Sequence, residues 1–233
     1  MGTSGAQDTP PARRGQRGRV EFEAIVFDMD GLLVDSEPVW KQAEHALVHD
    51  HGAKVDAPFH LTTVGLGMLE WAERVRAHYG LTASPQALSA HLVANMLERI
   101  PRLVRPRPGA PELVAASAAG PRAIASSSPT RLIELTLETL GWTPGFPTRC
   151  SAQEVARGKP APDVYLLAAE RLRVDPARCL ALEDSPTGAR AARAAGMTCW
   201  AVPDPTHSTP ASFAGITPHV YPDLGAVRRA LGL

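Results

Sequence analysis

The chain has 233 residues, 44% of them apolar, and its 24 basic and 24 acidic side chains leave a formal net charge of zero. A neutral chain has no global field that attracts nucleic acid or an anionic membrane. No apolar run approaches the roughly 20 residues of a membrane-spanning helix, and the length suits one domain with a sizeable insertion, or two small domains.

The three cysteines, Cys150, Cys179 and Cys199, are an odd number and lack the spacing of metal ligands. Cys179 and Cys199 fall in predicted buried strands, so we interpret the cysteines as reduced core thiols. No signal-peptide segment is recognisable in the sequence. Free thiols are typical of a reducing compartment, so we expect a cytoplasmic protein, and we also expect a monomer without a nucleic-acid or membrane partner.

Residues 1–19 are rich in Gly, Ser, Pro, Gln and Arg and contain almost nothing apolar. They cannot bury enough surface to form a core, so we predict a disordered tail. Its arginines could belong to a targeting peptide or a nucleic-acid-binding arm. However, no amphipathic period supports the first alternative, and the cluster is too short and sparse for the second. A solvated tail is the preferred interpretation.

The next segment, residues 20–36, contains an apolar run, Ala24 to Phe27, that stops at Asp28 and Asp30 and is followed by Gly31. Such a run predicts a strand buried on both faces. Acids at the carboxyl end of the strand would lie in the crevice where open α/β sheets bind ligands. Two neighbouring carboxylates repel each other unless a divalent cation or a shared proton holds them. A surface turn is the alternative, because Asp and Gly are turn formers.

Residues 37–102 have helical periodicity and no convincing strand. A first helix is expected from about Pro38, which is a good first-turn residue. Further helical patterns cover residues 68–78 and 85–100, and a linker rich in Pro and Gly follows up to Gly109. We therefore predict a helical domain that is inserted between two parts of an α/β core, residues 20–36 and 103–233.

An alternation of helices and strands resumes after this linker. Strands that alternate with helices imply a parallel sheet with helices on both faces, which is a doubly wound α/β fold. Ser185, Pro186 and Gly196 are suited to begin and end the helix between the last two strands. The expected strands are 122–126, 179–182 and 198–202, and the expected helices are 112–119, 129–140, one that ends at Arg173, and 186–195.

Polar residues follow two of these strands. Ser126 ends one strand, where a hydroxyl and the amides of a helix start can hold phosphate oxygens, while Ser128 is expected to cap the following helix. Glu183 and Asp184 end another strand. Their oxygens, together with those of the first pair of acids, suit octahedral Mg²⁺ and do not suit zinc. Acids that merely balance a helix dipole are the alternative for this pair.

Lys159 lies in the segment Gly158-Lys159-Pro160-Ala161-Pro162-Asp163, where the prolines keep its backbone out of a helix. A fixed ammonium group offsets the negative charge that accumulates during phosphoryl transfer. A lysine before proline is more often a surface residue, so the interpretation depends on the motifs around it.

These segments, in this order, resemble the four motifs of the haloacid dehalogenase superfamily. The runs AIVFDMDGLLVDSEPVW (24–40) and ALEDSPTGARAARAAGM (181–197) are similar to the β-phosphoglucomutase-like branch of that family. The Asp-Ser-Glu-Pro-x-Trp run is similar to the hexitol and 2-deoxyglucose 6-phosphate phosphatases of the branch. The resemblance implies a Rossmann-like core with a helical cap over the active site.

The resemblance also implies a Mg²⁺-dependent phosphatase that hydrolyses a small phosphorylated metabolite, such as a sugar or polyol phosphate, through an aspartyl phosphate. Asp28 would be the nucleophile and Asp30 the general acid and base. Ser126 and the Ser127 amide would orient the phosphoryl group, and Lys159 would hold its charge. The implied metal ligands are the carboxylates of Asp28, Asp30, Glu183 and Asp184.

Two rival functions remain open. The first is a sugar phosphate mutase of the β-phosphoglucomutase type. Trp40 stands where those mutases carry a histidine, and Pro129 stands where they carry a basic residue, which favours the phosphatase. Trp40 could form a wall over a sugar ring or simply pack in the core. The second rival is a catalytically inactive binding module on the same fold, which the intact acids and Lys159 argue against.

Overall fold

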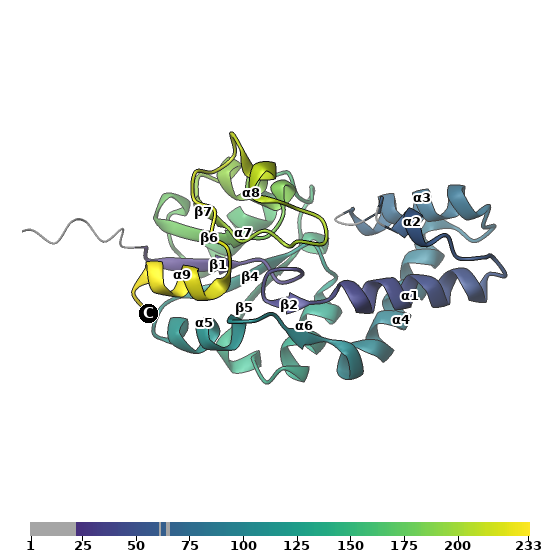
Figure 1. Cartoon of the computed structure of the whole chain (residues 1–233), viewed down its shortest axis with the longest axis horizontal. Helices are drawn as coiled ribbons and strands as arrows, with labels where there is room; N and C mark the ends of the chain where they lie inside the picture. Colours follow the sequence, from purple (N-terminus) through teal and green to yellow (C-terminus); the bar gives the residue numbers. More distant parts are fainter. Residues whose placement is uncertain (1–21, 61, 64–65) are drawn as a thin grey trace, which may run out of the picture.

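A parallel five-stranded sheet forms the centre of the computed structural model, which describes residues 22–60, 62–63 and 66–233 (Figure 1). The predicted disordered tail, residues 1–19, lies outside the described residues. The strand order is β5-β4-β1-β6-β7. The strands are β1 (Ala24–Phe27), β4 (Arg122–Ser126), β5 (Thr148–Ser151), β6 (Cys179–Glu183) and β7 (Thr198–Ala201).

Helices cover both faces of this sheet (Figure 1). Side chains alternate across each strand, so Val26 packs in the cluster beneath one helix layer and Phe27 in the cluster beneath the other. The predicted doubly wound α/β core is therefore confirmed. One layer contains α7 (Asp163–Leu172) and α8 (Pro186–Ala194), and the other contains α5 (Ala110–Ala116), α6 (Thr130–Thr139) and α9 (Leu224–Leu231).

Four helices lie beside the sheet, on the right of Figure 1. The longest of them, α4, packs against α1 and α3 and also against α6 of the core. Its N-terminus is capped by the Ser84 hydroxyl, which accepts a hydrogen bond from the backbone N–H of Ala87. The four helices are α1 (Glu37–Asp50), α2 (Ala57–His60), α3 (Met68–Tyr79) and α4 (Pro85–Leu103).

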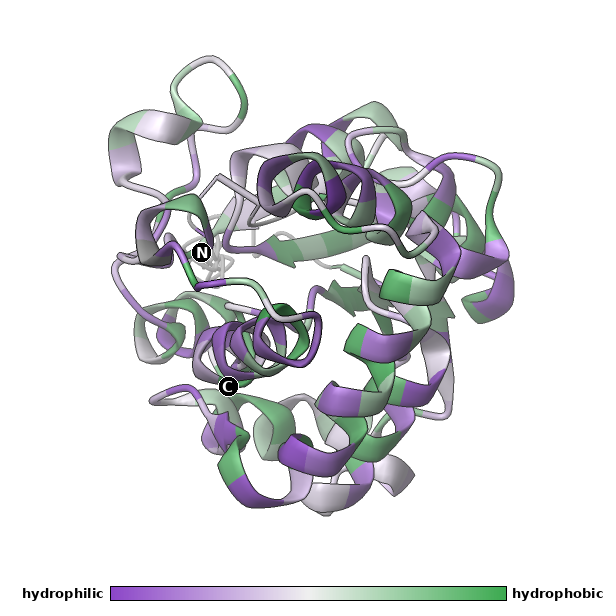
Figure 2. Cartoon of the chain, turned by 90° about the vertical axis from the view of Figure 1, so that its right-hand side faces the viewer, coloured by the Kyte–Doolittle hydropathy of each residue, from purple (hydrophilic) through white to green (hydrophobic). Residues whose placement is uncertain are grey.

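The chain passes between the sheet and these helices through a short antiparallel ribbon, β2 (Val34–Asp35) with β3 (Arg105–Pro106). Figure 2 shows hydrophobic strands surrounded by helices on which hydrophobic and hydrophilic residues alternate. This pattern places the apolar side of each amphipathic helix against the sheet or against a neighbouring helix. None of the helices in the described part of the chain is long and apolar enough to span a membrane.

Several short elements were not predicted. The strands of the β2–β3 ribbon have two residues each, too few to show a period, and edge strand β5 carries polar side chains at Thr148 and Arg149. The four-residue helix α2 and the eight-residue helix α9 were also missed. The remaining elements are one-turn helices of the 3₁₀ type at Ser117–Ala119, Thr143–Gly145, Ala152–Glu154, Pro176–Arg178 and Pro210–Phe213.

The local signals around α8 behave as predicted. The Ser185 hydroxyl accepts a hydrogen bond from the backbone N–H of Gly188, Pro186 begins the helix, and Gly196 adopts a positive φ directly after its end. The three cysteines are free and buried, as expected.

Candidate active site

The carboxyl ends of β1, β4 and β6 open into a cavity of about 360 Å³, and α1, His60, Thr63 and the start of α3 line its other side. Because β1 is the central strand, its carboxyl end has β4 on one side and β6 on the other. This topology brings together residues that are far apart in the sequence. The predicted residues that line the cavity are Asp28, Asp30, Ser126, Ser127, Lys159 and Asp184.

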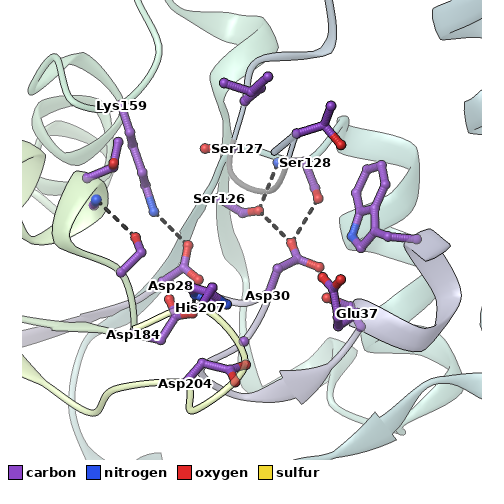
Figure 3. A pocket seen from close by; sticks show the side chains of 18 of the residues that line it. Asp28, Asp30, Glu37, Ser126, Ser127, Ser128, Lys159, Asp184, Asp204 and His207 are labelled. Atoms are coloured by element: carbon purple, nitrogen blue, oxygen red, sulfur yellow. Dashed lines mark hydrogen bonds and ion pairs between the residues drawn. The ribbon is translucent and has the colours of Figure 1, made fainter. Parts of the chain in front are cut away.

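Lys159 is held between two buried carboxylates. Its Nζ lies 2.6 Å from Asp28 Oδ1 and 2.6 Å from Glu183 Oε1 (Figure 3 shows the contact with Asp28). Burial alone would lower the pKa of Lys159, but the two carboxylates outweigh burial and raise it. The ammonium group is therefore charged over the physiological pH range.

Glu183 holds the Lys159 ammonium group in place. It is fully buried, and its Oε1 also accepts a hydrogen bond from the Tyr165 hydroxyl at 2.7 Å. Its Oε2 accepts hydrogen bonds from the backbone N–H groups of Asp184 and Ser185 and from the Ser185 hydroxyl. Burial would raise the pKa of Glu183, but Lys159 and these donors lower it. The carboxylate is thus ionised and surrounded by donors, and it fixes the position of the lysine.

A glycine makes room for Glu183. A Cβ atom on Gly188 would lie 1.7 Å from Glu183 Oε1. The first turn of α8 can therefore approach the carboxylate only because this residue has no side chain.

Asp30 faces away from the lysine and toward the end of β4. Its Oδ2 accepts hydrogen bonds from the hydroxyls of Ser126 at 3.1 Å and Ser128 at 2.8 Å (Figure 3). The expectation that Ser128 caps the following helix is wrong. The N-cap of α6 is Pro129, and the Ser128 hydroxyl donates its hydrogen bond to Asp30 Oδ2 instead of to the helix start.

Asp184 lies against the turn that follows β1. A Cβ atom on Gly31, which has a φ of +84°, would be 2.1 Å from Asp184 Oδ2. Burial raises the pKa of Asp184 to about 6, opposed by a hydrogen bond with His207, whose Nε2 lies 3.1 Å from Oδ2. Burial also raises the pKa of Asp28 well above its usual range. Lys159 lowers this pKa, whereas the nearby acids raise it further. This part of the cavity has an excess of buried negative charge.

Carboxylate oxygens of Asp28, Glu183 and Asp184 lie within 4.8 Å of one another. Hard oxygen ligands with an excess of negative charge fit Mg²⁺. Glu183 has the least capacity left for an ion, because both of its oxygens already accept hydrogen bonds. In the described residues, the side chain of Asp30 belongs to no group of potential metal ligands. Asp28 and Asp184 therefore fit the ion best.

Several residues in the cavity or next to it were not predicted from the sequence. Asp204 and His207 form a second group with Asp184, and Arg107 forms an ion pair with Asp204 at 2.8 Å. These residues lie in loops without a recognisable motif. Asp204, two residues beyond the expected strand 198–202, could have been found from the rule that residues at the carboxyl ends of parallel strands converge.

The helical side of the cavity carries a second set of charges. His60 lies between Glu37, at 2.6 Å, and Glu44, at 3.1 Å. Trp40 lines the cavity, is half-buried and also packs against the apolar core, so both interpretations of it have support.

Comparison with known proteins is consistent with this geometry. A family model described as haloacid dehalogenase-like hydrolase matches residues 22–196. Hexitol phosphatase B of Escherichia coli strain K12 is 34% identical over 186 residues, which cover 78% of this chain and 84% of that protein. The plasmid-encoded protein CbbY of Cupriavidus necator is 37% identical over 222 residues, covering 85% of this chain and 86% of that protein.

A solved structure shows the same similarity. The crystal structure of CbbY from Rhodobacter sphaeroides in complex with phosphate superposes with a TM-score of 0.81 at 26% sequence identity. The match covers 91% of this chain and 100% of that chain.

Gly188→Ala should displace Glu183 and release Lys159, because the added methyl group and the carboxylate cannot occupy the same space. We expect a loss of about 1–3 kcal/mol in the free energy of unfolding, the usual cost of overpacking. Chemical denaturation measures it. Gly120→Ala is the matched control, since a Cβ there meets nothing within 4 Å. Equal stabilities of the two variants would contradict the packing described for Glu183.

The position of His60 between two acids makes stability depend on pH. Burial would lower the pKa of His60, but Glu37 and Glu44 outweigh burial and raise it from 6.5 to about 9. Because the folded-state pKa is the higher one, the stabilisation is complete below pH 6.5 and is lost as the pH rises through about 9.

The stability difference between the wild type and His60→Gln, measured by denaturation over this pH range, should therefore shrink as the pH increases. The exposed His49→Gln is the control and should change little. A difference for His60→Gln that stays constant with pH would show that His60 is not protonated in the folded protein.

Proposed function

Because the chain belongs to the haloacid dehalogenase-like hydrolase family, in its β-phosphoglucomutase-like branch, and is a phosphoric monoester hydrolase, we propose that it is a Mg²⁺-dependent phosphatase acting through an aspartyl phosphate. The proposed substrate is a small phosphorylated metabolite, a sugar or polyol phosphate, as the name of the hexitol phosphatase relative suggests. The observation that carries the proposal is the buried Asp28 carboxylate at the end of the central strand, 2.6 Å from Lys159.

In the proposed first step, a carboxylate oxygen of Asp28 attacks phosphorus, and the bond between phosphorus and the leaving oxygen breaks. Asp30 gives its proton to that oxygen. In the second step Asp30 takes a proton from water as the water attacks the aspartyl phosphate, which returns Asp28 and releases phosphate. The two serine hydroxyls that contact Asp30 support this role, because they keep its carboxyl group turned into the cavity.

The remaining residues offset the charge of the phosphoryl group and orient it. Lys159 offsets the negative charge that develops on the phosphoryl group. Ser126 and the Ser127 amide orient the phosphoryl oxygens. We propose that Asp28 and Asp184 hold Mg²⁺, with Asp30 and Glu183 beside them, and that the ion supplies further positive charge next to the phosphate.

We also propose that residues 37–102 act as a cap domain on a core of residues 20–36 and 103–233. The packing of α1 and α3 against α4 supports this division. A monomer in the cytoplasm, without a nucleic-acid or membrane partner, is proposed as well. The free, buried cysteine thiols support a reducing compartment.

Asp28→Asn should lower kcat for hydrolysis of p-nitrophenyl phosphate at least about a thousandfold, because an amide cannot replace the nucleophile. Circular dichroism should show an unchanged fold. Asp50→Asn, an exposed acid on α1, serves as the control and should retain full activity. Substantial Mg²⁺-dependent phosphate release by Asp28→Asn would rule out its role as the nucleophile.

Incubation with β-glucose 1-phosphate, Mg²⁺ and a trace of glucose 1,6-bisphosphate separates the phosphatase from the mutase. We expect free phosphate as the main product, because Trp40 lines the cavity where the mutases carry a histidine. The same mixture with excess EDTA should release none. Glucose 6-phosphate formed much faster than free phosphate would identify a mutase.

A further inference from the structure

A row of charged side chains extends from the interior of the helical region into the cavity. Glu44, on α1, is only 2% exposed and accepts hydrogen bonds from Trp71 Nε1 at 3.0 Å and from Thr63 at 3.5 Å. His60 contacts the same oxygen of Glu44 with Nδ1, while its Nε2 contacts Glu37 Oε1. A buried carboxylate thus anchors a histidine that in turn holds a second carboxylate.

The geometry requires a protonated histidine. A neutral imidazole has one donor and one acceptor nitrogen, so it could satisfy only one of the two carboxylates. Both ring nitrogens of His60 face carboxylate oxygens, at 3.1 Å and 2.6 Å, and the imidazolium form donates to both. The row therefore consists of one imidazolium group between two carboxyl groups, and Glu37 is its outer member.

Glu37 is the member that reaches the substrate side. It precedes Pro38 at the start of α1, and its side chain is 24% exposed. It projects into the same cavity as Asp30 (Figure 3). Within the described part of the chain, His60 is its only hydrogen-bond donor. A side chain oriented in this way can accept hydrogen bonds from hydroxyl groups of a substrate.

The described lining of the cavity offers no unpaired cation for a second phosphate. No arginine is found among the described residues that line it, and Lys159 is the only lysine. Lys159, His60 and His207 each already contact a carboxylate. A second phosphate group beyond the reacting one would meet the negative charge of Glu37 with no positive charge to offset it.

We propose that Glu37, oriented by His60 and anchored through Glu44, determines substrate specificity. It selects neutral polyhydroxylated monophosphates and rejects bisphosphates and phosphoesters without hydroxyl groups. The inference rests on the proposed phosphatase function and deepens it by naming the residues that would select the non-phosphate part of the substrate. Trp40, whose indole lines the cavity, adds an apolar surface for the carbon chain.

The test compares kcat/KM for sorbitol 6-phosphate, hexyl phosphate and fructose 1,6-bisphosphate. The wild type should prefer sorbitol 6-phosphate to each of the others by at least about tenfold. Glu37→Gln should reduce both preferences by about tenfold, mainly through a higher KM for sorbitol 6-phosphate. His60→Gln should act in the same direction, since it frees the Glu37 side chain.

A ratio of kcat/KM values does not depend on the folded fraction, so a variant that folds poorly still gives an answer. Glu73→Gln, an exposed acid on α3 outside the cavity, is the matched control and should keep the wild-type ratios. Ratios for Glu37→Gln within twofold of the wild type would overturn the proposal. So would a wild type that prefers the bisphosphate or hexyl phosphate.

Failure of the proposed function is distinguishable from failure of this inference. A protein that releases no phosphate from any of these esters, nor from p-nitrophenyl phosphate, is not a phosphatase. In that event calorimetry measures the dissociation constants of the three esters for the wild type, Glu37→Gln and Glu73→Gln, and the ratios between esters are calculated from these constants. The expected tenfold change, and the twofold limit that contradicts it, apply to those constants unchanged.

Discussion

The ammonium group of Lys159, buried between Asp28 and Glu183, is the constraint on which the rest of the site depends. Removing one partner of a buried ion pair typically costs about 3–5 kcal/mol, because the other charge is left uncompensated. The arrangement therefore requires β1 and β6 to be neighbours in the sheet. Only then do Asp28, directly after β1, and Glu183, the last residue of β6, face one lysine. It also requires Gly188 at the start of α8, where any side chain would displace Glu183.

Among the described residues, a cation between two carboxylates occurs twice, on opposite sides of one cavity. In the core, Lys159 leaves an excess of negative charge at Asp28 and Asp184, which suits a divalent cation and a phosphate. On the helical side, His60 leaves one negative charge at Glu37, which suits hydroxyl groups. In the proposed account, reaction chemistry and substrate choice would belong to two separate segments of the chain, which the β2–β3 ribbon joins.

Local signals predicted most of the fold and many of the residues that line the cavity. The apolar run before Asp28, the cap of Ser185 and the glycine after α8 depend on neighbouring residues, and the structure has each of them as expected. Ser128 was mistaken for a cap because its true partner, Asp30, is 98 residues away in the sequence. The contacts of His60 with two acids of α1 arise from helix packing, which leaves no motif in the sequence.

The central claim is that Asp28 carries the phosphoryl group during turnover. Asp30→Asn should still form the aspartyl phosphate from p-nitrophenyl phosphate, an ester with a good leaving group, but should fail to hydrolyse it. Acid quenching followed by peptide mass spectrometry measures this directly. The expected result is the mass of one phosphoryl group on Asp28, removed by hydroxylamine and absent in Asp28→Asn protein treated in the same way. Label on any other residue, or no label while phosphate is still released, would contradict the claim.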